Sequence, residues 1–356
     1  MRCALNVPLE GGEVVHDHRL REAIPTLSYL TERGARVVVI SHIGDSGTET
    51  LAPVVRALGA RLRNVSFSQE IVGATVRAAV RNLLPGHILV LENLRRDARE
   101  KKNDGAFAKE LAHVADIFVQ DSFDTCHREH SSIIGVPRFL PSYAGLTLER
   151  EVTELARALS PRKPSLAIIG GAKFATKKVL LEKLLAHYDT VWVGGALAND
   201  FLKARGESVG KSLVSGADSA SIDHILKNPR LLLPEDVVAV ASGASRIAIN
   251  DVRTDENILD IGPASRERLA TLAQKAETIL WNGPLGNYEN GFVDGTHACA
   301  TAVARSSAYS VVGGGDTVAA IEDLGLLPQF SFVSTGGGAM LEFLAKGTLP
   351  GIEALS

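Results

Sequence analysis

Glycine follows nearly every apolar, β-branched run in the second half of the chain. Leu166–Ile169 leads into Gly170–Lys173, and Val311–Val312 leads into Gly313–Thr317. Further glycine-containing turns begin at Gly194, Gly283 and Gly336. Glycine allows backbone N–H groups to approach an anion closely, and a following helix adds the positive end of its dipole. One such turn more often serves packing than binding, but their repetition in one half of the chain predicts a phosphate site.

Charged side chains accompany these glycines. Lys173 and Lys177 supply cations, and Asp316 supplies a carboxylate suited to Mg²⁺. The combination predicts that the second half of the chain holds the polyphosphate of a nucleotide.

Basic side chains follow the apolar runs of the first half instead. These residues are His42, Arg95 and the group His127, Arg128 and His130, while Arg19 follows the opening segment Asn6–Pro8. Guanidinium groups pair carboxylate or phosphate in a bidentate manner. The pattern predicts a pocket for a small, multiply charged acid. One half for a nucleotide and one for an acid indicate a transfer reaction between two ligands.

Two other signals do not fit their motifs. Gly206–Ser212 resembles a P-loop but has one residue too few between its glycines. The scattered residues His16, His18, Cys126, His127 and His130 lack the paired spacing of zinc ligands. We therefore predict neither a P-loop nor a zinc site.

Composition bounds the remaining possibilities. The chain has 356 residues, enough for two domains, and its net charge of −3 gives no reason to expect nucleic acid or a membrane as partner. The cysteines Cys3, Cys126 and Cys299 are too few and too scattered for a disulfide framework. No signal peptide or long apolar segment is recognisable, so we expect a cytoplasmic protein with small-molecule substrates.

Short apolar runs alternate with segments of helical spacing, which favours parallel sheets covered by helices on both faces. We expect an α/β protein of two doubly wound, Rossmann-like domains that face a cleft and are joined by the helix 146–159. The expected domains are 1–158 for the acid and 159–347 for the nucleotide, with a tail, 348–356, returning to the first. The expected strands are 37–40, 88–91, 117–119, 166–169, 190–193, 278–281, 309–312 and 332–334. The expected helices are 20–33, 51–62, 106–114, 178–187, 265–275 and 295–305.

The chain resembles the phosphoglycerate kinase family along essentially its whole length. The stretches that carry the resemblance are Asn6–Pro8, Ser41–Gly44, Leu91–Arg95, His127–Ser131, Gly170–Lys173, Trp281–Pro284, Gly313–Thr317, Ser334–Ala339 and Leu349–Leu355. Many ordered motifs in one chain are far more specific than any one of them.

The resemblance implies reversible phosphoryl transfer from 1,3-bisphosphoglycerate to Mg-ADP, which gives 3-phosphoglycerate and ATP. By position, it assigns the acid to Asn6, Arg19, His42, Arg95 and Arg128. It assigns the nucleotide to Gly171, Lys173, Lys177, Asn282, Pro284, Glu289, Gly314, Gly315, Asp316 and Thr317, with Asp316 on Mg²⁺ and Glu289 on the ribose. It also implies a monomer.

The implied chemistry is direct in-line transfer without a protein nucleophile, so catalysis consists of positioning and of neutralising charge on the moving oxygens. Arg19 and Lys177 are the expected sources of positive charge. The amides of Gly337 and Gly338 are expected to contact the transferring phosphoryl group.

Several positions depart from the family pattern: Ala4, Asp45, Asp124, Thr176, Ala196 and Ile258. Asp45 stands where the family has a phosphate-binding Arg, whereas Ala196 and Ile258 replace glycines and would narrow the adenine pocket. Three hypotheses follow. The chain is an active enzyme of altered strength, an inactive homologue with a nucleotide-binding regulatory role, or a kinase for a different small carboxylate or acyl phosphate.

Overall fold

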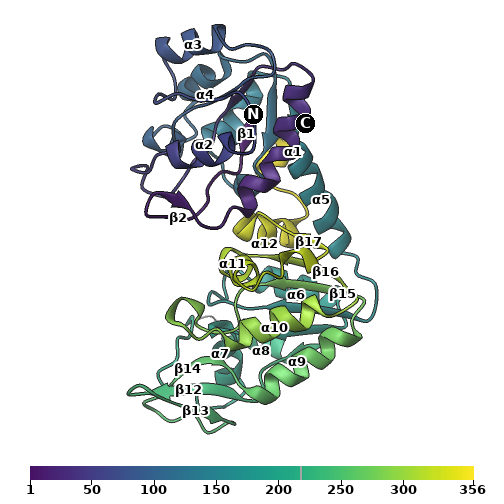
Figure 1. Cartoon of the computed structure of the whole chain (residues 1–356). Helices are drawn as coiled ribbons and strands as arrows, with labels where there is room; N and C mark the ends of the chain where they lie inside the picture. The colour runs from purple at the N-terminus through teal and green to yellow at the C-terminus, as the bar shows by residue number, and fades with distance from the viewer. Residues whose placement is uncertain (217–218) are drawn as a thin grey trace. The chain divides into compact units, whose positions relative to one another are not determined.

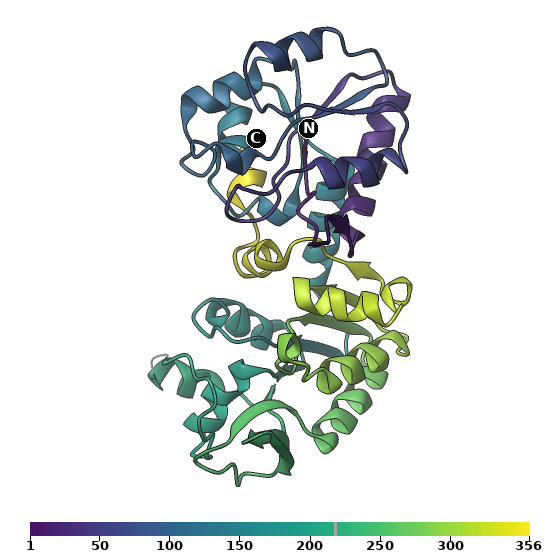
Figure 2. The same cartoon turned by 60° about the vertical axis from the view of Figure 1, so that its left-hand side comes forward.

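The computed structural model describes residues 1–216 and 219–356, which divide into two compact units. Unit 1 comprises Met1–Thr153 together with Lys346–Ser356, and unit 2 comprises Glu154–Ala345. The first boundary falls within helix α5 (Leu146–Ala158), the segment expected to be helical at the end of the first domain. Both termini therefore belong to unit 1 (Figures 1 and 2).

Unit 1 contains two short parallel sheets that are joined into one surface. One sheet has the order β1-β7-β8 and the other β4-β6-β5. A parallel bridge between Arg2 and Ile40 links β1 to the end of β4. The strands are β1 (Arg2–Cys3), β4 (Val37–Val39), β5 (Val65–Phe67), β6 (Ile88–Val90), β7 (Phe118–Asp121) and β8 (Ser142–Ala144), beside the hairpin of β2 (Leu9–Glu10) and β3 (Glu13–Val14).

Helices connect these strands. They are α1 (His18–Glu32), α2 (Ala52–Gly59), α3 (Ala74–Arg81), α4 (Gly105–Ala112) and α13 (Pro350–Glu353), with the short helical turns η1 (Leu94–Arg96), η2 (Phe123–Thr125), η3 (Ser131–Gly135) and η4 (Val136–Arg138). Leu20 and Leu27 of α1 pack with Val37 and Val39 on one face of the sheet, whereas Phe107 and Leu111 of α4 pack with Val38 on the other. Successive strand residues point to opposite faces, so this pattern gives a sheet covered on both sides.

Unit 2 is built on a six-stranded sheet of order β11-β10-β9-β15-β16-β17, in which every pair is parallel. Its strands are β9 (Ser165–Ile169), β10 (Thr190–Val193), β11 (Leu231–Leu232), β15 (Thr278–Asn282), β16 (Tyr309–Gly313) and β17 (Phe332–Val333). The helices are α6 (Lys178–His187), α7 (Ala196–Ala204), α8 (Ser219–Leu226), α9 (Pro263–Lys275), α10 (Asp294–Ala304), α11 (Gly315–Asp323) and α12 (Gly337–Lys346), with the short turns η5 (Tyr288–Asn290) and η6 (Leu327–Gln329).

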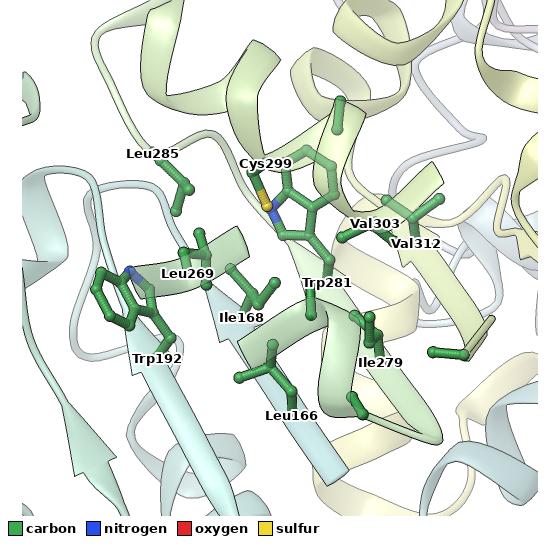
Figure 3. Close-up of a cluster of buried hydrophobic side chains, with 14 of the residues drawn as sticks. Leu166, Ile168, Trp192, Leu269, Ile279, Trp281, Leu285, Cys299, Val303 and Val312 are labelled. Carbon is green, nitrogen blue, oxygen red and sulfur yellow. The ribbon is translucent and has the colours of Figure 1, made fainter. Parts of the chain in front are cut away.

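The core of unit 2 forms where α9 and α10 pack on this sheet. Leu269 of α9 and Val303 of α10 lie with Ile168 and Trp281 of neighbouring strands in one buried cluster (Figure 3). Ala167 points to the opposite face and is also fully buried. Both faces of the sheet are therefore covered, and its strand ends are fixed in place.

One feature of unit 2 departs from the expected all-parallel pattern. Strands β12 (Val237–Ala241), β13 (Ala244–Ala248) and β14 (Asn257–Ile261) form an antiparallel sheet of order β13-β12-β14. Figure 1 shows it at the opposite end of unit 2 from α12. None of these three strands was among the expected ones, although β12 is an uninterrupted run of Val and Ala. Most residues of β13 are exposed, so that strand lacks the buried apolar pattern on which the strand predictions rest.

Candidate active site

The carboxyl ends of β9, β10, β15 and β16 carry the glycine turns of unit 2. Gly170 donates its N–H to Asn282 O at 2.8 Å, and Gly171 donates to Pro284 O at 3.0 Å. A Cβ on Gly170 would lie 2.1 Å from Pro284 O. Only glycine permits these two turns to approach so closely.

A cavity of about 930 Å³ opens at these turns. It is lined by the predicted residues Gly171, Lys173, Lys177, Pro284, Glu289 and Asp316, and by the altered positions Thr176, Ala196 and Ile258. Apolar side chains such as Leu202 and Leu285 line it as well. Apolar walls with a few placed polar groups are typical of small-molecule sites.

Lys177 lies immediately before α6, and its ammonium group is turned inward. Nζ donates to Gly170 O at 2.6 Å, and the residue is 7% exposed. Burial lowers the pKa of Lys177 to about 8, because a desolvated ammonium ion loses the stabilisation that water gives its charge. A phosphate oxygen in the cavity would restore that stabilisation.

The two triple-glycine turns open helices α11 and α12. Gly314 adopts φ +107°, a conformation that few other residues tolerate. A Cβ on Gly337 would lie 3.7 Å from Gly314 Cα, so the two turns are adjacent. Gly315 and Gly337 are the first residues of their helices and Gly338 follows, exposed, in α12. Two neighbouring helix N-termini direct unpaired N–H groups toward one region, which suits an anion.

The structure separates the remaining predicted nucleotide residues into exposed and buried groups. Asp316 is exposed in the first turn of α11, and Glu289 is exposed in η5. Thr317 is fully buried, and its Oγ1 accepts a hydrogen bond from Gly283 N at 3.1 Å. Asn282 is 4% exposed, and its Nδ2 lies 3.6 Å from Met340 Sδ. Thr317 and Asn282 therefore hold the glycine turns in their positions.

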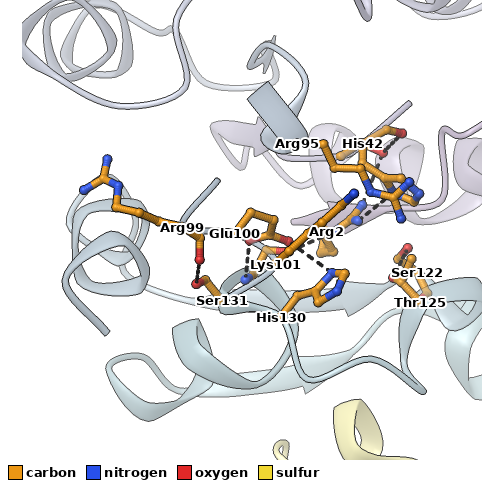
Figure 4. Close-up of polar contacts among 12 residues, drawn as sticks. Arg2, His42, Arg95, Arg99, Glu100, Lys101, Ser122, Thr125, His130 and Ser131 are labelled. Atoms are coloured by element: carbon orange, nitrogen blue, oxygen red, sulfur yellow. Dashed lines mark hydrogen bonds and ion pairs between the residues drawn. The ribbon is translucent and has the colours of Figure 1, made fainter. Parts of the chain in front are cut away.

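In unit 1 the basic residues gather around His42, which is 3% exposed (Figure 4). Nη2 of Arg2 lies 2.9 Å from Nδ1 of His42. A guanidinium group can only donate, so Nδ1 accepts and the ring proton resides on Nε2. Burial, and then the charge of Arg2, hold the pKa of His42 well below its usual value. The imidazole is therefore neutral and offers an Nε2–H donor.

The charges of the predicted arginines also act on this imidazole. After Arg2, the charges of Arg95, Arg19 and Arg128 lower the pKa of His42 further. Burial and the charges of Arg128 and Arg95 also lower the pKa of His130 to about 4. These residues come from segments far apart in the sequence, yet their charges act on the same two imidazoles, and their summed positive charge suits a multiply charged acid.

Asn6 joins this cluster through its backbone and side chain. Its carbonyl oxygen accepts from Arg19 Nη1 at 2.7 Å, and its Oδ1 accepts from Gly44 N at 3.0 Å. Asn6 thus connects Arg19 to the turn that follows His42.

Three altered positions lie in unit 1. Ala4 is buried, and Asp124 is 8% exposed with its Oδ1 accepting from Ser122 Oγ at 2.6 Å. Asp45 pairs with Arg95, whose Nη1 also donates to Gly44 O. A carboxylate of the chain itself therefore contacts one of the predicted acid-binding arginines.

Sequence reasoning missed four residues of these sites: Arg2, Ser132, Glu100 and Lys211. Arg2 is 1% exposed and donates to Ser132 Oγ at 3.1 Å, while Ser132 Oγ donates to buried Glu100 at 2.5 Å. Lys211, within the segment rejected as a P-loop, lines the cavity of unit 2. The sequence offered only weak signals for two of them: a basic residue just before the segment Asn6–Pro8 and a lysine beside Gly210.

Clusters of potential metal ligands provide a separate test. Within residues 1–216 and 219–356, no group of three or more His, Cys, Asp or Glu side chains is arranged to hold a metal ion. Asp316 is a single exposed carboxylate on the cavity wall. Such a group fits a Mg²⁺ ion that arrives with phosphate oxygens and keeps several waters, rather than a caged metal.

Across the part of the chain that the structure describes, no helix combines the length and apolar character that crossing a membrane requires.

Two parallel-sheet units, one with a glycine-lined cavity and one with an arginine cluster, define the class of nucleotide-dependent phosphotransferases acting on a small acid. The family model of phosphoglycerate kinase matches residues 1–347. The chain is 42% identical over 377 residues to a phosphoglycerate kinase of Roseiflexus castenholzii, covering 100% of this chain and 95% of that protein.

Solved structures agree with this match. The phosphoglycerate kinase of Coxiella burnetii superposes with a TM-score of 0.82 at 40% identity, and that of Pyrococcus horikoshii with 0.89 at 32%. Each comparison covers 99% of this chain and 94% of the other. The chain belongs to the phosphoglycerate kinase family. It is an enzyme of glycolytic phosphoryl transfer, and its substrates are a nucleotide and a phosphoglycerate.

Proposed function

We propose that unit 1 binds the three-carbon acid and unit 2 binds the nucleotide of the reaction 1,3-bisphosphoglycerate + ADP ⇌ 3-phosphoglycerate + ATP. The observation that carries this assignment is the contrast between the units. In unit 1 the charges of four guanidinium groups act on a neutral His42, whereas adjacent glycine turns and Lys177 border a cavity in unit 2. The first arrangement suits a compact polyanion, and the second suits a polyphosphate attached to an apolar base.

In the acid site, Arg95 and Arg128 pair the phosphate of the acid. Arg19 faces the reacting carboxylate, and Asn6 positions Arg19 through the 2.7 Å hydrogen bond to its carbonyl oxygen. His42 donates from Nε2, because Arg2 occupies Nδ1. None of these groups acts as a nucleophile, since the acyl phosphate is already activated.

In the nucleotide site, Leu202, Leu285 and Ile258 border the base, and Glu289 accepts from the ribose hydroxyls. The N-termini of α11 and α12 and the side chains of Lys173 and Lys177 receive the phosphates. The amides of Gly337 and Gly338 and the ammonium group of Lys177 neutralise charge on the transferring oxygens. Asp316 would hold Mg²⁺, and the bound ion would neutralise part of the negative charge of the nucleotide phosphates.

A coupled assay with ATP and 3-phosphoglycerate tests the reaction. The protein is expected to turn over both substrates, and Lys177→Ala to lose at least about a hundredfold in kcat through loss of transition-state charge stabilisation. Lys178→Ala is the matched control, because Lys178 Nζ donates to Ser221 Oγ at 2.7 Å and is absent from the cavity wall. Equal turnover by the protein and by Lys177→Ala would contradict the assignment.

We also propose that the chain acts as a monomer in the cytoplasm. The family resemblance implies a monomer, and Cys3, Cys126 and Cys299 are free, buried thiols. Free thiols persist in a reducing compartment. Light scattering during size-exclusion chromatography is expected to give a mass near 37.8 kDa.

A further inference from the structure

The turn after β4 folds over Arg95. Gly44 and Gly47 adopt φ values of +63° and +83°, and a Cβ on Gly47 would lie 2.2 Å from Arg95 O. Asn93 holds both ends of the same turn, since its Nδ2 donates to Ile43 O at 2.8 Å and to Glu49 O at 3.0 Å. The backbone of residues 44–47 is thus packed directly against the segment that carries Arg95.

This packing places Asp45 on the guanidinium group. Nη1 of Arg95 donates both to the Asp45 carboxylate and to Gly44 O. Lys101 Nζ donates to the Asp45 backbone oxygen at 2.7 Å and so ties this residue from the other side. Backbone contacts therefore hold the main chain of Asp45 beside Arg95, and from there its side chain reaches the guanidinium group.

The two partners differ greatly in exposure. The side chain of Arg95 is 3% exposed, whereas that of Asp45 is 91% exposed. Because Arg95 is buried, only a small part of its guanidinium group is accessible to an external anion. Its Nη1 already donates to two acceptors of the chain, Gly44 O and the Asp45 carboxylate. The exposed carboxylate is surrounded by water, so its hold on Arg95 is weak and can be displaced.

We propose that Asp45 is a built-in competitor for the acid: its carboxylate occupies Arg95 as an internal counterion, and the anionic group of the substrate must displace it. The inference rests on the proposed function of unit 1. It makes Asp45 a specificity-determining residue that weakens binding of the acid and leaves the nucleotide site untouched. A dianionic phosphate that pairs Arg95 through two hydrogen bonds can displace a single carboxylate, whereas a monoanionic acid competes on nearly equal terms.

A second mechanism would also weaken acid binding. Asp45 stands where the family pattern has a cation, so the loss of that cation alone could account for a low affinity. The two mechanisms differ in what Asp45→Asn does. Asparagine removes the competing charge without adding a cation, whereas Asp45→Arg removes the charge and adds a cation.

Calorimetric titration of 3-phosphoglycerate into the protein, Asp45→Asn, Asp45→Arg and Asp97→Asn separates these mechanisms. Asp97 is the matched control: its carboxylate pairs with Arg99 at 2.7 Å, and its loss changes the net charge equally without touching Arg95. Asp45→Asn is expected to bind the acid about three- to tenfold more tightly, as expected when a weak exposed ion pair is removed. Asp97→Asn is expected to remain within twofold of the unaltered protein.

Steady-state kinetics on the same variants give an independent readout. In Asp45→Asn the change is expected in KM for 3-phosphoglycerate, with KM for ATP constant. If only Asp45→Arg tightens binding of the acid, the proposal that Asp45 competes for Arg95 is overturned. The same holds if Asp97→Asn tightens binding as much as Asp45→Asn. Absence of turnover in all variants would reject the proposed function, yet tighter binding by Asp45→Asn would still support the inference. Absence of acid binding in every variant would overturn both.

Discussion

The ammonium group of Lys177 lies 2.6 Å from the carbonyl oxygen of Gly170, in a position where burial lowers its pKa from 10.5 to about 8. Among the residues that the structure describes, no charged neighbour contributes to that shift. The folded protein therefore bears a cost to keep this lysine charged at neutral pH. A bound polyphosphate supplies the missing negative charge and stabilises the ammonium group, and this stabilisation favours substrate binding.

Replacement of Lys177 by Met is expected to abolish turnover and yet stabilise the ligand-free protein by about 1 kcal/mol at pH 7. The lowered pKa means that burying the charged ammonium group costs the folded protein a few kcal/mol. Methionine removes this cost, but it also removes the hydrogen-bond donor to Gly170 O, which reduces the gain. Unfolded lysine binds more protons than folded Lys177 between pH 8 and 10.5, so the penalty is complete below pH 8 and fades as pH rises through this window. Urea unfolding at pH 7 and pH 10 measures it. A Met variant clearly less stable than the parent at pH 7 would contradict it.

Alanine at Gly171 is expected to reduce kcat at least tenfold with only modest loss of stability. Gly171 adopts φ +88°, and a Cβ there would lie 2.5 Å from Lys177 Nζ. The flexible lysine can move aside, so the clash displaces the ammonium group more than it unfolds the protein. Gly325→Ala is the control: φ is +67° and nothing lies within 4 Å of its Cβ. Both variants should lose about 1–2 kcal/mol in thermal unfolding, and only Gly171→Ala should lose activity.

The protein is expected to lose stability as pH falls from 6.5 toward 4, in part through His130. Its folded pKa is about 4, because burial and then the charge of Arg128 disfavour the imidazolium ion. The unfolded state binds more protons in this window, so the neutral ring contributes stability that is present above pH 6.5 and lost as pH falls toward 4. Urea unfolding at pH 7 and pH 5 is expected to show that His130→Gln loses about 1 kcal/mol less than the parent. An equal loss would assign the acid sensitivity to other groups.

Substitution of Asp316 by Asn is expected to lower kcat/KM for ATP about a hundredfold and to remove most of the effect of Mg²⁺ on ADP affinity. The carboxylate is exposed on the cavity wall, where it can bind a hydrated ion. Calorimetry with ADP in Mg²⁺ and in EDTA checks this. Asp294→Asn is the control, because Asp294 also lies in the first turn of a helix and pairs with Arg266 outside the cavity. Equal sensitivity of both variants to Mg²⁺ removal would refute the metal role.

The central strands of the parallel sheets and the glycine turns were predictable because each depends on local sequence. The expected strand Thr190–Val193 and helix Lys178–His187 match β10 and α6 residue for residue, and the other expected elements differ by one to three residues at their ends. Buried parallel strands are short apolar runs, and the turns that follow need glycine whatever the rest of the chain does. The glycine turns that border the cavity of unit 2 could therefore be predicted from the local sequence.

The relationships within unit 1 were not predictable in the same way. Arg2 meets His42 because the register between β1 and the end of β4 places Arg2 opposite Ile40. Asp45 meets Arg95 because two glycines with positive φ fold the intervening turn back. Strand register and turn direction depend on tertiary packing, so local sequence patterns do not reveal them. Such pairs decide the charge of a site, and they become visible only in the folded molecule.

Unit 1 is assembled from the two ends of the chain, and this has a consequence for biosynthesis. Gly351 donates its N–H to Cys126 O at 2.8 Å, and a Cβ on Gly351 would lie 2.7 Å from Ile133 Cγ2. Leu355 packs against the cluster that contains Val136. At about 5–20 residues per second, the ribosome needs roughly 10–40 s to make the segment between these two parts of unit 1. During this time unit 1 lacks residues 346–356. Its packing can be completed only after these residues have left the ribosome.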